Sequence, residues 1–401
     1  MSLDLARVAV QVEEMAAGLA AERRDRAARL DRAVHTLHAQ SGDLDTLRKR
    51  VEASRTSWLV AGIGDDPAMR HPPVLLPEAF AVLASDGSHI DVDRHSPARC
   101  ALINIGTVML RYGSNPDALL SNSPTLYTGS QNLAITNPQG SDEQRLEGAV
   151  LGMKRDVAEC IALADLALES PPHIPTLALF DGSLIMWGLA GQTYPDFVKT
   201  ELLDNGFLAG LARLRDAGHK RQLAVASYIS FPRSTDVVNA LRVAVCPHDP
   251  PNCDLHCRSF PPADRPCDEV AGIQDSSVFS AVLEHGERSA TFTSRSSIVR
   301  ERYGEHEIRF CYLKTDEEIG RMEFPRWVEE RDLVDLLHSL ILDQCCRGHG
   351  YPVALSEAHE QAVVNASDRQ RFQELVEAAL AERSFPTLTS AKSRSKRTRW
   401  I

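Results

Sequence analysis

The sequence predicts an α/β protein in which helices flank a mixed sheet, with a helical arm before this core and additional strands and helices after it. Two observations lead to this fold class. Three strand patterns follow one another between residues 79 and 136, and helices and strands then alternate as far as residue 243. Three strands in succession followed by alternation indicate a mixed sheet that helices cover.

The composition is that of a globular protein without a membrane segment. Of the 401 residues, 43% are hydrophobic and 25% are charged, which is ordinary for such proteins. No apolar run is long enough to span a membrane, and the N-terminus lacks the features of a signal peptide. Nine cysteines, several of them isolated, favour a reducing compartment, so we expect a cytoplasmic protein. The net charge of −11 argues weakly against a surface coated with nucleic acid.

Residues 1–56 are predicted to form a helical arm. The apolar residues of its first half follow the spacing of a heptad seam: Leu5, Val8, Val12, Met15 and Leu19. Ser41-Gly42-Asp43 interrupts the helix, and Asp43 is suited to cap a second one. The arm would either pack on its own domain or dock a second copy or a partner protein, and the sequence leaves both alternatives open.

The core elements follow in order. Strand patterns occur at residues 79–85, 100–112, 124–136, 176–181 and 222–230. Helical patterns occur at residues 141–168, 197–218 and 234–243. Ser141 or Asp142 would cap the first of these helices, and Ser234 or Thr235 the last. Further strands are expected at residues 291–299, 306–314 and 320–325, and amphipathic helices at 327–346 and 356–380.

Asp-Gly-Ser occurs twice, each time after a buried-strand pattern, so both aspartates are expected at strand ends. Asp86 follows the first strand and Asp181 follows the fourth. One copy alone would be an ordinary turn signal. If the two strands are neighbours, however, the carboxylates come together and repel each other unless a cation lies between them. Oxygen ligands of this kind suit Mg²⁺ or Mn²⁺.

The helix between the two motifs carries a third acidic candidate. Arg155 and Glu159 are four residues apart and share a helix face, which alone would indicate a surface salt bridge. An aspartate on the first strand, a glutamate on the helix after the third and an aspartate on the fourth is, however, the layout of the ribonuclease H fold. There the carboxylates hold two divalent metal ions for in-line attack on a phosphodiester.

The chain resembles the bacterial form of the NurA family of DNA-repair nucleases. The matching stretches lie between about residues 78 and 370: ASDGSHIDVDRH, INIGTVMLRYG, RDVAE, LFDGSLI, YISFPRSTDVVNALR, YLKTDEEIGRMEFPRWV and GYPVALSEAHEQAV. The resemblance implies a ribonuclease H-like nuclease domain, placed here at residues 57–385, with Mn²⁺-dependent cleavage of DNA and 5′-to-3′ resection of ends. It also implies a ring-like homodimer that works with the hexameric HerA helicase-translocase.

The resemblance also implies a set of site residues: Asp86, Glu159, Asp181, Tyr351 and His359. Asp86, Glu159, Asp181 and His359 would hold the metal ions. The spacing of the helix glutamate leaves Glu147 and Glu169 open as alternatives to Glu159. A histidine at such a site can ligate the metal, donate to a phosphate oxygen or protonate the leaving group. Tyr351 would contact a phosphate or a metal-bound water.

Three basic residues are candidates for contacts with the DNA backbone: Arg233, Lys314 and Arg321. Arg233 precedes an expected helix start, where exposed N–H groups favour anions, although plain capping is an alternative. Lys314 and Arg321 lie on or beside late strands, where they would either line a DNA groove or serve solubility. Because aromatic residues make up only 6% of the chain, we expect backbone recognition with little sequence specificity.

A Cys- and Pro-rich insertion at residues 246–270 is expected to be largely loop. Its cysteines follow C-x6-C-x3-C-x9-C: Cys246, Cys253, Cys257 and Cys267. Four thiolates could hold a structural Zn²⁺ ion, but the spacing lacks the C-x2-C pairs typical of zinc sites, so free thiols remain an alternative. Residues 386–401 form a basic tail that is expected to be frayed.

The sequence thus predicts a deoxyribonuclease that uses two metal ions and processes DNA ends in double-strand break repair. Exonuclease activity is expected, with single-strand endonuclease activity beside it. One alternative is a HerA-docking subunit with weak or no activity. Another is a ribonuclease H-fold nuclease that acts on RNA or on junctions, because the fold alone does not separate these substrates.

Overall fold

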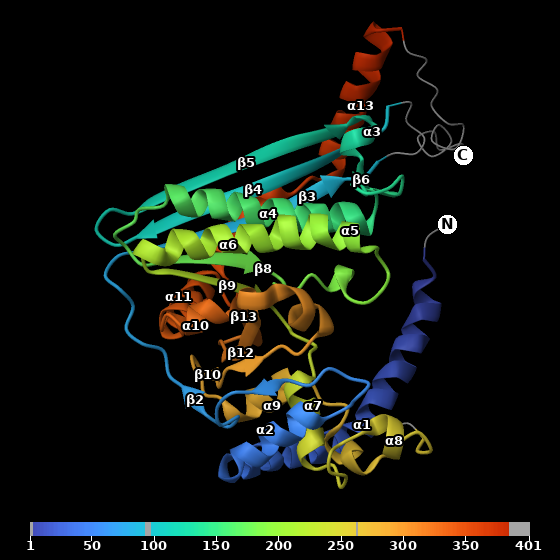
Figure 1. Ribbon diagram of the computed structural model, residues 1–401, viewed down its shortest axis with the longest axis vertical. Coiled ribbons are helices and arrows are strands. Elements are labelled where there is room, and N and C mark those ends of the chain that lie inside the picture. The colour runs from blue at the N-terminus through green and yellow to red at the C-terminus, as the bar shows by residue number, and fades with distance from the viewer. Residues whose placement is uncertain (1–2, 93–97, 262–263, 385–401) are drawn as a thin grey trace. The chain divides into compact units, whose positions relative to one another are not determined.

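The computed structural model describes residues 3–92, 98–261 and 264–384, which form two compact units (Figure 1). Unit 1 comprises Met1–Pro73, Ile229–Ser296 and Arg309–Met322. Unit 2 comprises Val74–Tyr228, Ser297–Ile308 and Glu323–Ile401. The predicted basic tail lies outside the described residues.

The sheet of unit 2 is mixed, as the sequence predicts. Its strand order is β9-β8-β3-β4-β5. The strands are β3 (Phe80–Ile90), β4 (Cys100–Tyr112), β5 (Asp117–Thr128), β8 (Thr176–Asp181) and β9 (Leu223–Ile229). The first three run antiparallel to one another, whereas β8 is parallel to both β3 and β9. Three antiparallel strands followed by parallel ones joined through helices confirm the predicted ribonuclease H-like class.

Helices cover both faces of this sheet. On one face, Leu151 of α4 (Ala149–Glu169) packs against Ile103 and Ile105 of β4. Alternate strand residues point to opposite faces, so Gly106 of β4 faces away from α4. On that side, the backbone of α12 (Val353–Ala362) lies directly against Gly106. In Figure 1, α5 (Asp196–Lys199), the π-helical turn Thr200–Phe207 and α6 (Leu208–Ala217) run beside α4, against which Gly206 and Gly210 pack.

The remaining elements of unit 2 are shorter or lie late in the chain. They are α3 (Gly129–Asn132), β6 (Ala134–Thr136), β7 (Glu143–Arg145), α10 (Arg326–Glu329), α11 (Val334–Arg347) and α13 (Ala366–Glu382). The predicted helix at residues 327–346 is therefore two helices, and Asp332 between them has a φ of 56° that a continuous helix does not allow. The strand predicted at 124–136 lies earlier, as β5, and ends where α3 begins.

Unit 1 is built on small strands around an aromatic core. Strands β1 (Gly62–Ile63), β11 (Phe292–Thr293), β12 (Ile308–Lys314) and β13 (Ile319–Pro325) are neighbours in this order. Strand β10 (Arg288–Ser289) pairs with β12 and with β2 (Arg70–His71). The rings of Phe279, Phe292, Phe310 and Tyr312 contact one another in the core. Of the strand predicted at 291–299, only Phe292–Thr293 forms.

The predicted arm consists of α1 (Leu5–Ala39) and α2 (Leu44–Ala53), and Asp43 accepts a hydrogen bond from the N–H of Thr46 as a cap. Ala33 and Leu37, in the second half of α1, are buried in the core of unit 1 beside α7 (Asp236–Ala244) and α9 (Asp275–Val282). Four of the five seam residues of the first half are instead 50–69% exposed, namely Leu5, Val12, Met15 and Leu19, whereas Val8 is half-buried. Docking through this half stays a prediction.

Two predicted helix caps are wrong. Helix α4 begins at Ala149 after Gly148, whereas Asp142 belongs to the β6–β7 hairpin, where its carbonyl accepts from the N–H of Asn137. The predicted cap placed the start of the helix about eight residues too early. Residues 143–145 in this interval form strand β7 instead. Helix α7 receives no side-chain cap from Ser234 or Thr235.

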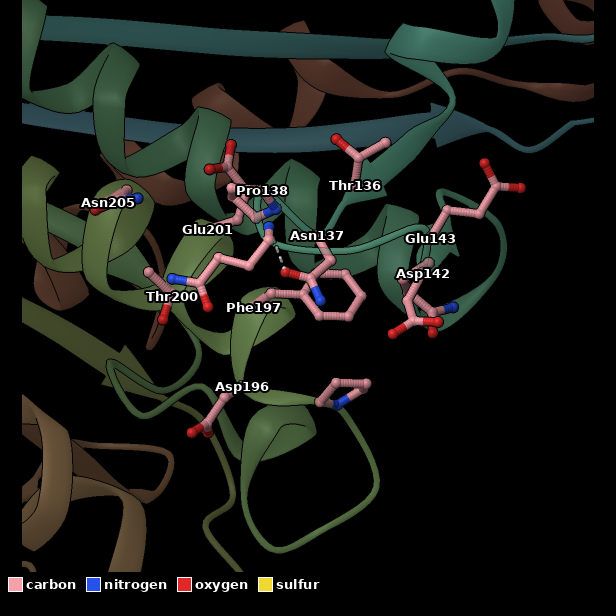
Figure 2. A pocket seen from close by; sticks show the side chains of 13 residues that line it. Thr136, Asn137, Pro138, Asp142, Glu143, Asp196, Phe197, Thr200, Glu201 and Asn205 are labelled. Atoms are coloured by element: carbon pink, nitrogen blue, oxygen red, sulfur yellow. Dashed lines mark hydrogen bonds between the residues drawn. The ribbon is translucent and has the colours of Figure 1, made fainter.

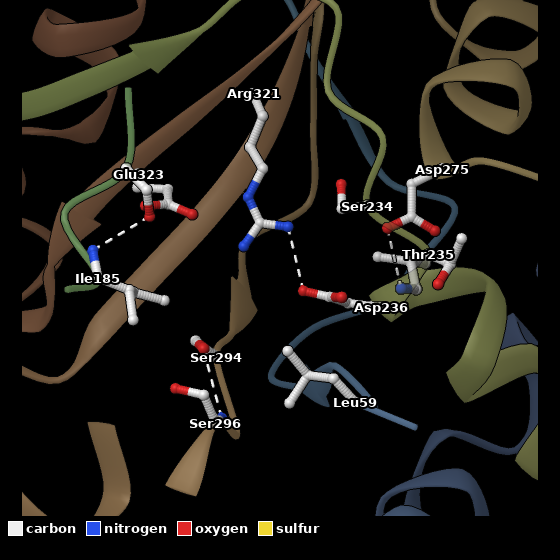
Figure 3. Close-up of polar contacts among 12 residues, drawn as sticks. Leu59, Ile185, Ser234, Thr235, Asp236, Asp275, Ser294, Ser296, Arg321 and Glu323 are labelled. Carbon is white, nitrogen blue, oxygen red and sulfur yellow. Dashed lines mark hydrogen bonds and ion pairs between the residues drawn. The ribbon is translucent and has the colours of Figure 1, made fainter. Parts of the chain in front are cut away.

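The cap of α7 comes from a distant residue, Asp275, which is drawn in Figure 3. Its carboxylate accepts from the N–H groups of Val237 and Val238 at 3.1 and 2.8 Å and from the hydroxyl of Tyr312 at 2.7 Å. Asp275 is fully buried, and burial raises its pKa to about 7, with Asp236 adding to the rise. A non-local cap of this kind is invisible to a search for capping residues near the helix start.

None of the helices in the described part of the chain is long and apolar enough to cross a membrane.

The raised pKa of Asp275 predicts a pH dependence of stability. The folded state binds this proton more tightly than the unfolded chain, so the contribution is complete below the ordinary pKa of 3.8 and is lost as the pH rises through about 7. We predict that the free energy of unfolding of the wild type falls by a few kcal/mol relative to that of Asp275→Asn over this interval. Chemical denaturation at several pH values measures both, and parallel pH profiles would contradict the prediction.

Candidate active site

The register of unit 2 places Asp86 and Asp181 beside each other. Strands β3 and β8 are parallel neighbours whose last matched pair is Ser85 with Phe180. The aspartates are the next residue on each strand, so they occupy equivalent positions about 4.8 Å apart in the direction between strands. Two segments nearly a hundred residues apart in the sequence therefore present their carboxylates at one point of the sheet.

The two Asp-Gly-Ser motifs are not structurally equivalent, which corrects the prediction that both end a strand. The second does: β8 ends at Asp181, and Gly182 has a φ of +78° that turns the chain. The first lies inside β3, which continues to Ile90 with Asp86 paired to Gly106. A sequence pattern typical of a turn stays extended here because the long strand β4 pairs with β3 along its whole length.

Gly87 is needed for the approach of helix α4 rather than for a turn. A Cβ at this position would stand 2.5 Å from Oε1 of Glu159 and 2.8 Å from Cγ of Arg155. The hydroxyl of Ser85, on the same face of β3, donates to the backbone carbonyl of Glu159 at 3.1 Å. Glu159 therefore lies directly on the first motif, from the face of the sheet opposite to the one that Asp86 faces.

Tyr351 and His359 contact the two aspartates from the other face of the sheet. The Tyr351 hydroxyl donates to Oδ1 of Asp181 at 2.8 Å, and Nδ1 of His359 lies 2.7 Å from Oδ2 of Asp86. His359 reaches this position because α12 lies directly on Gly106, where any side chain would collide with its backbone. The structure thus brings together all five residues that the resemblance singled out.

Of the three candidate glutamates, only Glu159 reaches the aspartates. Glu169 is the exposed last residue of α4, and Glu147 precedes the helix and pairs with Arg99. The side chain of Glu159 is 14% exposed, and its Oε1 lies 2.9 Å from Nε of Arg155. The two atoms form an ion pair without hydrogen-bond geometry, so this buried oxygen lacks a hydrogen-bond donor.

The carboxyl groups raise one another's proton affinity. Burial raises the pKa of Glu159 well above its usual range against the effect of Arg155, and Asp156, Asp86 and Asp181 raise it further. Burial also raises the pKa of Asp181, which Asp86 raises further while the hydrogen bond from Tyr351 lowers it. Burial and the charge of Asp181 raise the pKa of Tyr351. Cationic charge among these groups would relieve the repulsion.

Asp86, Glu159 and Asp181 line one cavity of about 410 Å³. In the described residues, no three His, Cys, Asp or Glu side chains converge closely enough to hold a metal ion as they stand. The reason at this site is that Asp86 faces His359, Asp181 faces Tyr351 and Glu159 faces Arg155. The three carboxylates nevertheless fit a hard divalent cation, because they supply oxygen ligands and negative charge. Oε1 of Glu159 also lacks a hydrogen-bond donor.

A larger cavity of about 610 Å³, between the β6–β7 hairpin and the start of α5, has a different character (Figure 2). Its carboxylates are all exposed to solvent: Asp142, Glu143, Asp196 and Glu201. Exposed carboxylates are hydrated, whereas the side chains of Asp86 and Glu159 in the smaller cavity are only 17% and 14% exposed and are partly stripped of water. The smaller cavity is therefore the candidate active site.

The predicted DNA-contacting residues do not join this cluster. Arg321 is only 3% exposed, and Figure 3 shows its guanidinium directed at Asp236, 3.1 Å away. Because its charge is also stacked over the Phe310 ring, the prediction that Arg321 lines a DNA groove is wrong. The ammonium of Lys314 donates to the carbonyls of Ser280 and Leu283 at the end of α9. Arg233 is exposed, and its role stays a prediction.

The four cysteines of the insertion lie in unit 1 with free thiols. Burial and the neighbouring Cys257, Cys267 and Cys246 raise the pKa of Cys253 to about 11, with Arg265 opposing. This mutual influence places the thiols near one another, but within the described residues they are not gathered around a common point. A structural Zn²⁺ ion at Cys246, Cys253, Cys257 and Cys267 stays a prediction.

Sequence reasoning missed several residues that shape the site. Trp187 lines the cavity six residues after Asp181. Glu323 accepts hydrogen bonds from the hydroxyl of Ser183 and the N–H of Leu184, which fixes the second motif. The buried hydroxyl of Tyr303 binds the backbone at Met186 and Leu184. The only signal in the sequence is the proximity of Trp187 to the motif, because the other contacts join distant segments.

The strand arrangement and the acidic cavity define a protein of the ribonuclease H-like class. A model of the NurA domain matches residues 80–364, most of the chain, and the chain belongs to this family. Membership places it among nuclease-related proteins.

No curated protein sequence matches this chain. Among solved structures, it is similar to a prototype foamy virus protease–reverse transcriptase, with 13% identity, a TM-score of 0.22 and coverage of 39% of this chain and 18% of that one. It is also similar to the Aquifex aeolicus Argonaute, with 11% identity, a TM-score of 0.26 and coverage of 71% and 28%. A further match is LC9-RNase H1, with 8% identity, a TM-score of 0.21 and coverage of 42% and 71%. The chain thus spans less than a third of the first two proteins, and such low TM-scores add nothing to the argument from topology.

The close approach of α4 to β3 gives a test of the site's architecture. We predict that Gly87→Ala lowers the free energy of unfolding by roughly 1–3 kcal/mol, because the new methyl group forces Glu159 and Arg155 away from the strand. Gly152→Ala is the control, because a Cβ at this position of α4 would meet no atom within 4 Å, and it should be neutral or stabilising by about 0.5–1 kcal/mol. Urea denaturation compares the two. Equal effects would mean that α4 does not lie against Gly87.

Proposed function

We propose that the chain is a metal-dependent deoxyribonuclease whose active site is the cavity lined by β3, α4, β8 and the loop that follows β8. One observation carries this proposal: Asp86, Asp181 and Glu159, from three separate elements of a NurA-family chain, line a single cavity in which their charges repel. Such an arrangement is unfavourable for a fold alone, since buried carboxylates are stable when paired or bound to metal.

Asp86, Asp181 and Glu159 would hold Mn²⁺ or Mg²⁺, two ions in all. When bound, the ions supply an activated water and neutralise the charge of the departing oxygen. Arg155 occupies the Glu159 carboxylate until then. With that carboxylate at a cation, the guanidinium would keep its hydrogen bond to Asp156 and have its remaining N–H groups available for a phosphate in the same cavity.

His359 and Tyr351 are the proton-handling and positioning groups of the proposal. The imidazole of His359 is 61% exposed while one nitrogen faces Asp86, so it can meet a substrate and exchange a proton with the departing oxygen. Tyr351 stays protonated because its pKa is raised, and its hydroxyl orients the Asp181 carboxylate. Tyr351 precedes α12 and His359 lies on it, so the packing of α12 against Gly106 positions both side chains.

The finer assignments follow from family membership and are proposals of the same kind. They comprise 5′-to-3′ end resection in double-strand break repair, a homodimer and a HerA-type hexameric partner. The exposed apolar seam of α1 is suited to one of these contacts. The acidic net charge fits an enzyme to which a translocating partner delivers the DNA.

The aspartates provide the direct test of catalysis. We predict that Asp86→Asn and Asp181→Asn each reduce Mn²⁺-dependent cleavage of end-labelled DNA by at least about a hundredfold while leaving the fold intact, because each removes a carboxylate ligand of the metal. Asp165→Asn, an exposed aspartate on α4, is the matched control. Cleavage by either site variant at the wild-type rate would remove the proposal. A wild-type protein that cleaves RNA or junctions but not linear DNA would redirect it to another substrate.

The helix glutamate can be identified by metal binding without any cleavage assay. We predict that Mn²⁺ raises the melting temperature of the wild type, of Glu147→Gln and of Glu169→Gln, and raises that of Glu159→Gln much less. In chelator, Glu159→Gln should melt no lower than the wild type, since it removes a carboxylate that burial disfavours. Equal Mn²⁺ shifts for Glu159→Gln and the wild type would exclude Glu159 as a ligand.

A further inference from the structure

Trp187 is an exposed aromatic side chain at the edge of the candidate active site. It lies in a short 3-10 turn, Trp187–Leu189, six residues beyond Asp181. Its side chain lines the same cavity as Asp86 and Asp181, and 45% of its surface is exposed. Large apolar rings left open to solvent beside a polar cavity are typical of binding surfaces.

The indole is held in one orientation by a chain of hydrogen bonds that ends in the protein interior. Its Nε1–H donates to the hydroxyl of Ser183 at 3.1 Å, and Ser183 donates to Oε2 of Glu323 at 2.8 Å. Glu323 is 1% exposed and also accepts from the N–H of Leu184 at 2.9 Å. The serine of the second Asp-Gly-Ser motif therefore orients the tryptophan while the aspartate serves the acidic cluster.

A second anchor fixes the backbone on which Trp187 stands. The hydroxyl of Tyr303, a fully buried residue, accepts from the N–H of Met186 at 2.9 Å and donates to the carbonyl of Leu184 at 3.0 Å. The N–H of Trp187 itself donates to the carbonyl of Ile185 at 2.7 Å. An exposed ring on so constrained a turn is prepared in advance for a ligand, since little freedom is left to lose on binding.

We propose that Trp187 stacks on an unpaired nucleobase of the strand whose phosphate lies at the acidic cluster. The cavity of about 410 Å³ is within the range of roughly 300–1000 Å³ found for small-ligand sites, which suits one nucleotide. An indole face binds any base, whereas the faces of paired bases inside a duplex are hidden. The substrate is therefore single-stranded or a frayed end at the point of cleavage. This inference rests on the proposed function and narrows its substrate.

The test compares DNA with and without bases. Binding of a labelled oligothymidylate, and of an abasic strand of equal length, is measured by fluorescence anisotropy at low ionic strength with Ca²⁺ in place of Mn²⁺. Trp187→Ala should bind the oligothymidylate about tenfold or more weakly and the abasic strand as the wild type does, because stacking alone is lost. Trp187→Phe keeps a ring and should stay close to the wild type. Phe260→Ala, an exposed aromatic in the Cys-rich insertion, is the matched control and should change neither strand.

Ser183→Ala tests the orienting chain, and cleavage kinetics give a second readout. Ser183→Ala should weaken binding of the oligothymidylate by less than Trp187→Ala and leave the abasic strand unaffected. In Mn²⁺, Trp187→Ala should raise KM for single strands more than it lowers kcat. A loss that is equal for both strands, or no loss at all, would overturn the stacking role, as would a wild-type protein that binds neither strand.

The two proposals fail in different ways. If Trp187→Ala binds and cleaves like the wild type, the nuclease assignment stands and the stacking role falls. If the wild type shows base-dependent binding through Trp187 but no cleavage with any divalent ion, the stacking role stands and the nuclease assignment falls.

Discussion

The structure of unit 2 depends on one electrostatic constraint, the gathering of Asp86, Glu159 and Asp181 around a single cavity. Like charges in a partly desolvated place destabilise a fold unless something neutralises them. Here each carboxylate contacts a different side chain: Asp86 contacts His359, Glu159 contacts Arg155, and Asp181 contacts Tyr351. Even with these partners, burial keeps the pKa values of Glu159 and Asp181 raised, and the neighbouring carboxylates raise them further. The proposed cation would supply the positive charge that this arrangement lacks.

The packing of unit 2 is arranged around this cluster from both faces of the sheet. Gly87 admits α4, and with it Glu159, while Gly106 admits α12, and with it His359. The two glycines lie on adjacent strands, at neighbouring register positions, and on opposite faces. The parallel pairing of β3 with β8 then sets Asp181 beside Asp86. A side chain at Gly87 would push α4 and Glu159 away from β3, and one at Gly106 would push α12 and His359 away from β4.

The local part of this architecture could be predicted from the sequence and the non-local part could not. The strand patterns before Asp86 and Asp181, and the apolar stripe of α4, are visible because they are short-range periodicities. Tyr351 and His359 were reached only through a family resemblance, since no pattern links residues in the last quarter of the chain to a strand near its start. The choice among Glu147, Glu159 and Glu169 stayed open because spacing along the sequence does not show which residue of the helix lies against β3. The internal pairing of Arg321 and the cap from Asp275 were missed for the same reason, because their partners are far away in sequence.

The most direct test of the central claim is crystallographic. Crystals of the full chain soaked in Mn²⁺ and measured at the manganese absorption edge should give anomalous density in the cavity, bounded by the carboxylates of Asp86, Asp181 and Glu159. Arg155 should then have released Glu159. Well-ordered crystals at saturating Mn²⁺ with no anomalous peak among these three side chains would contradict the account.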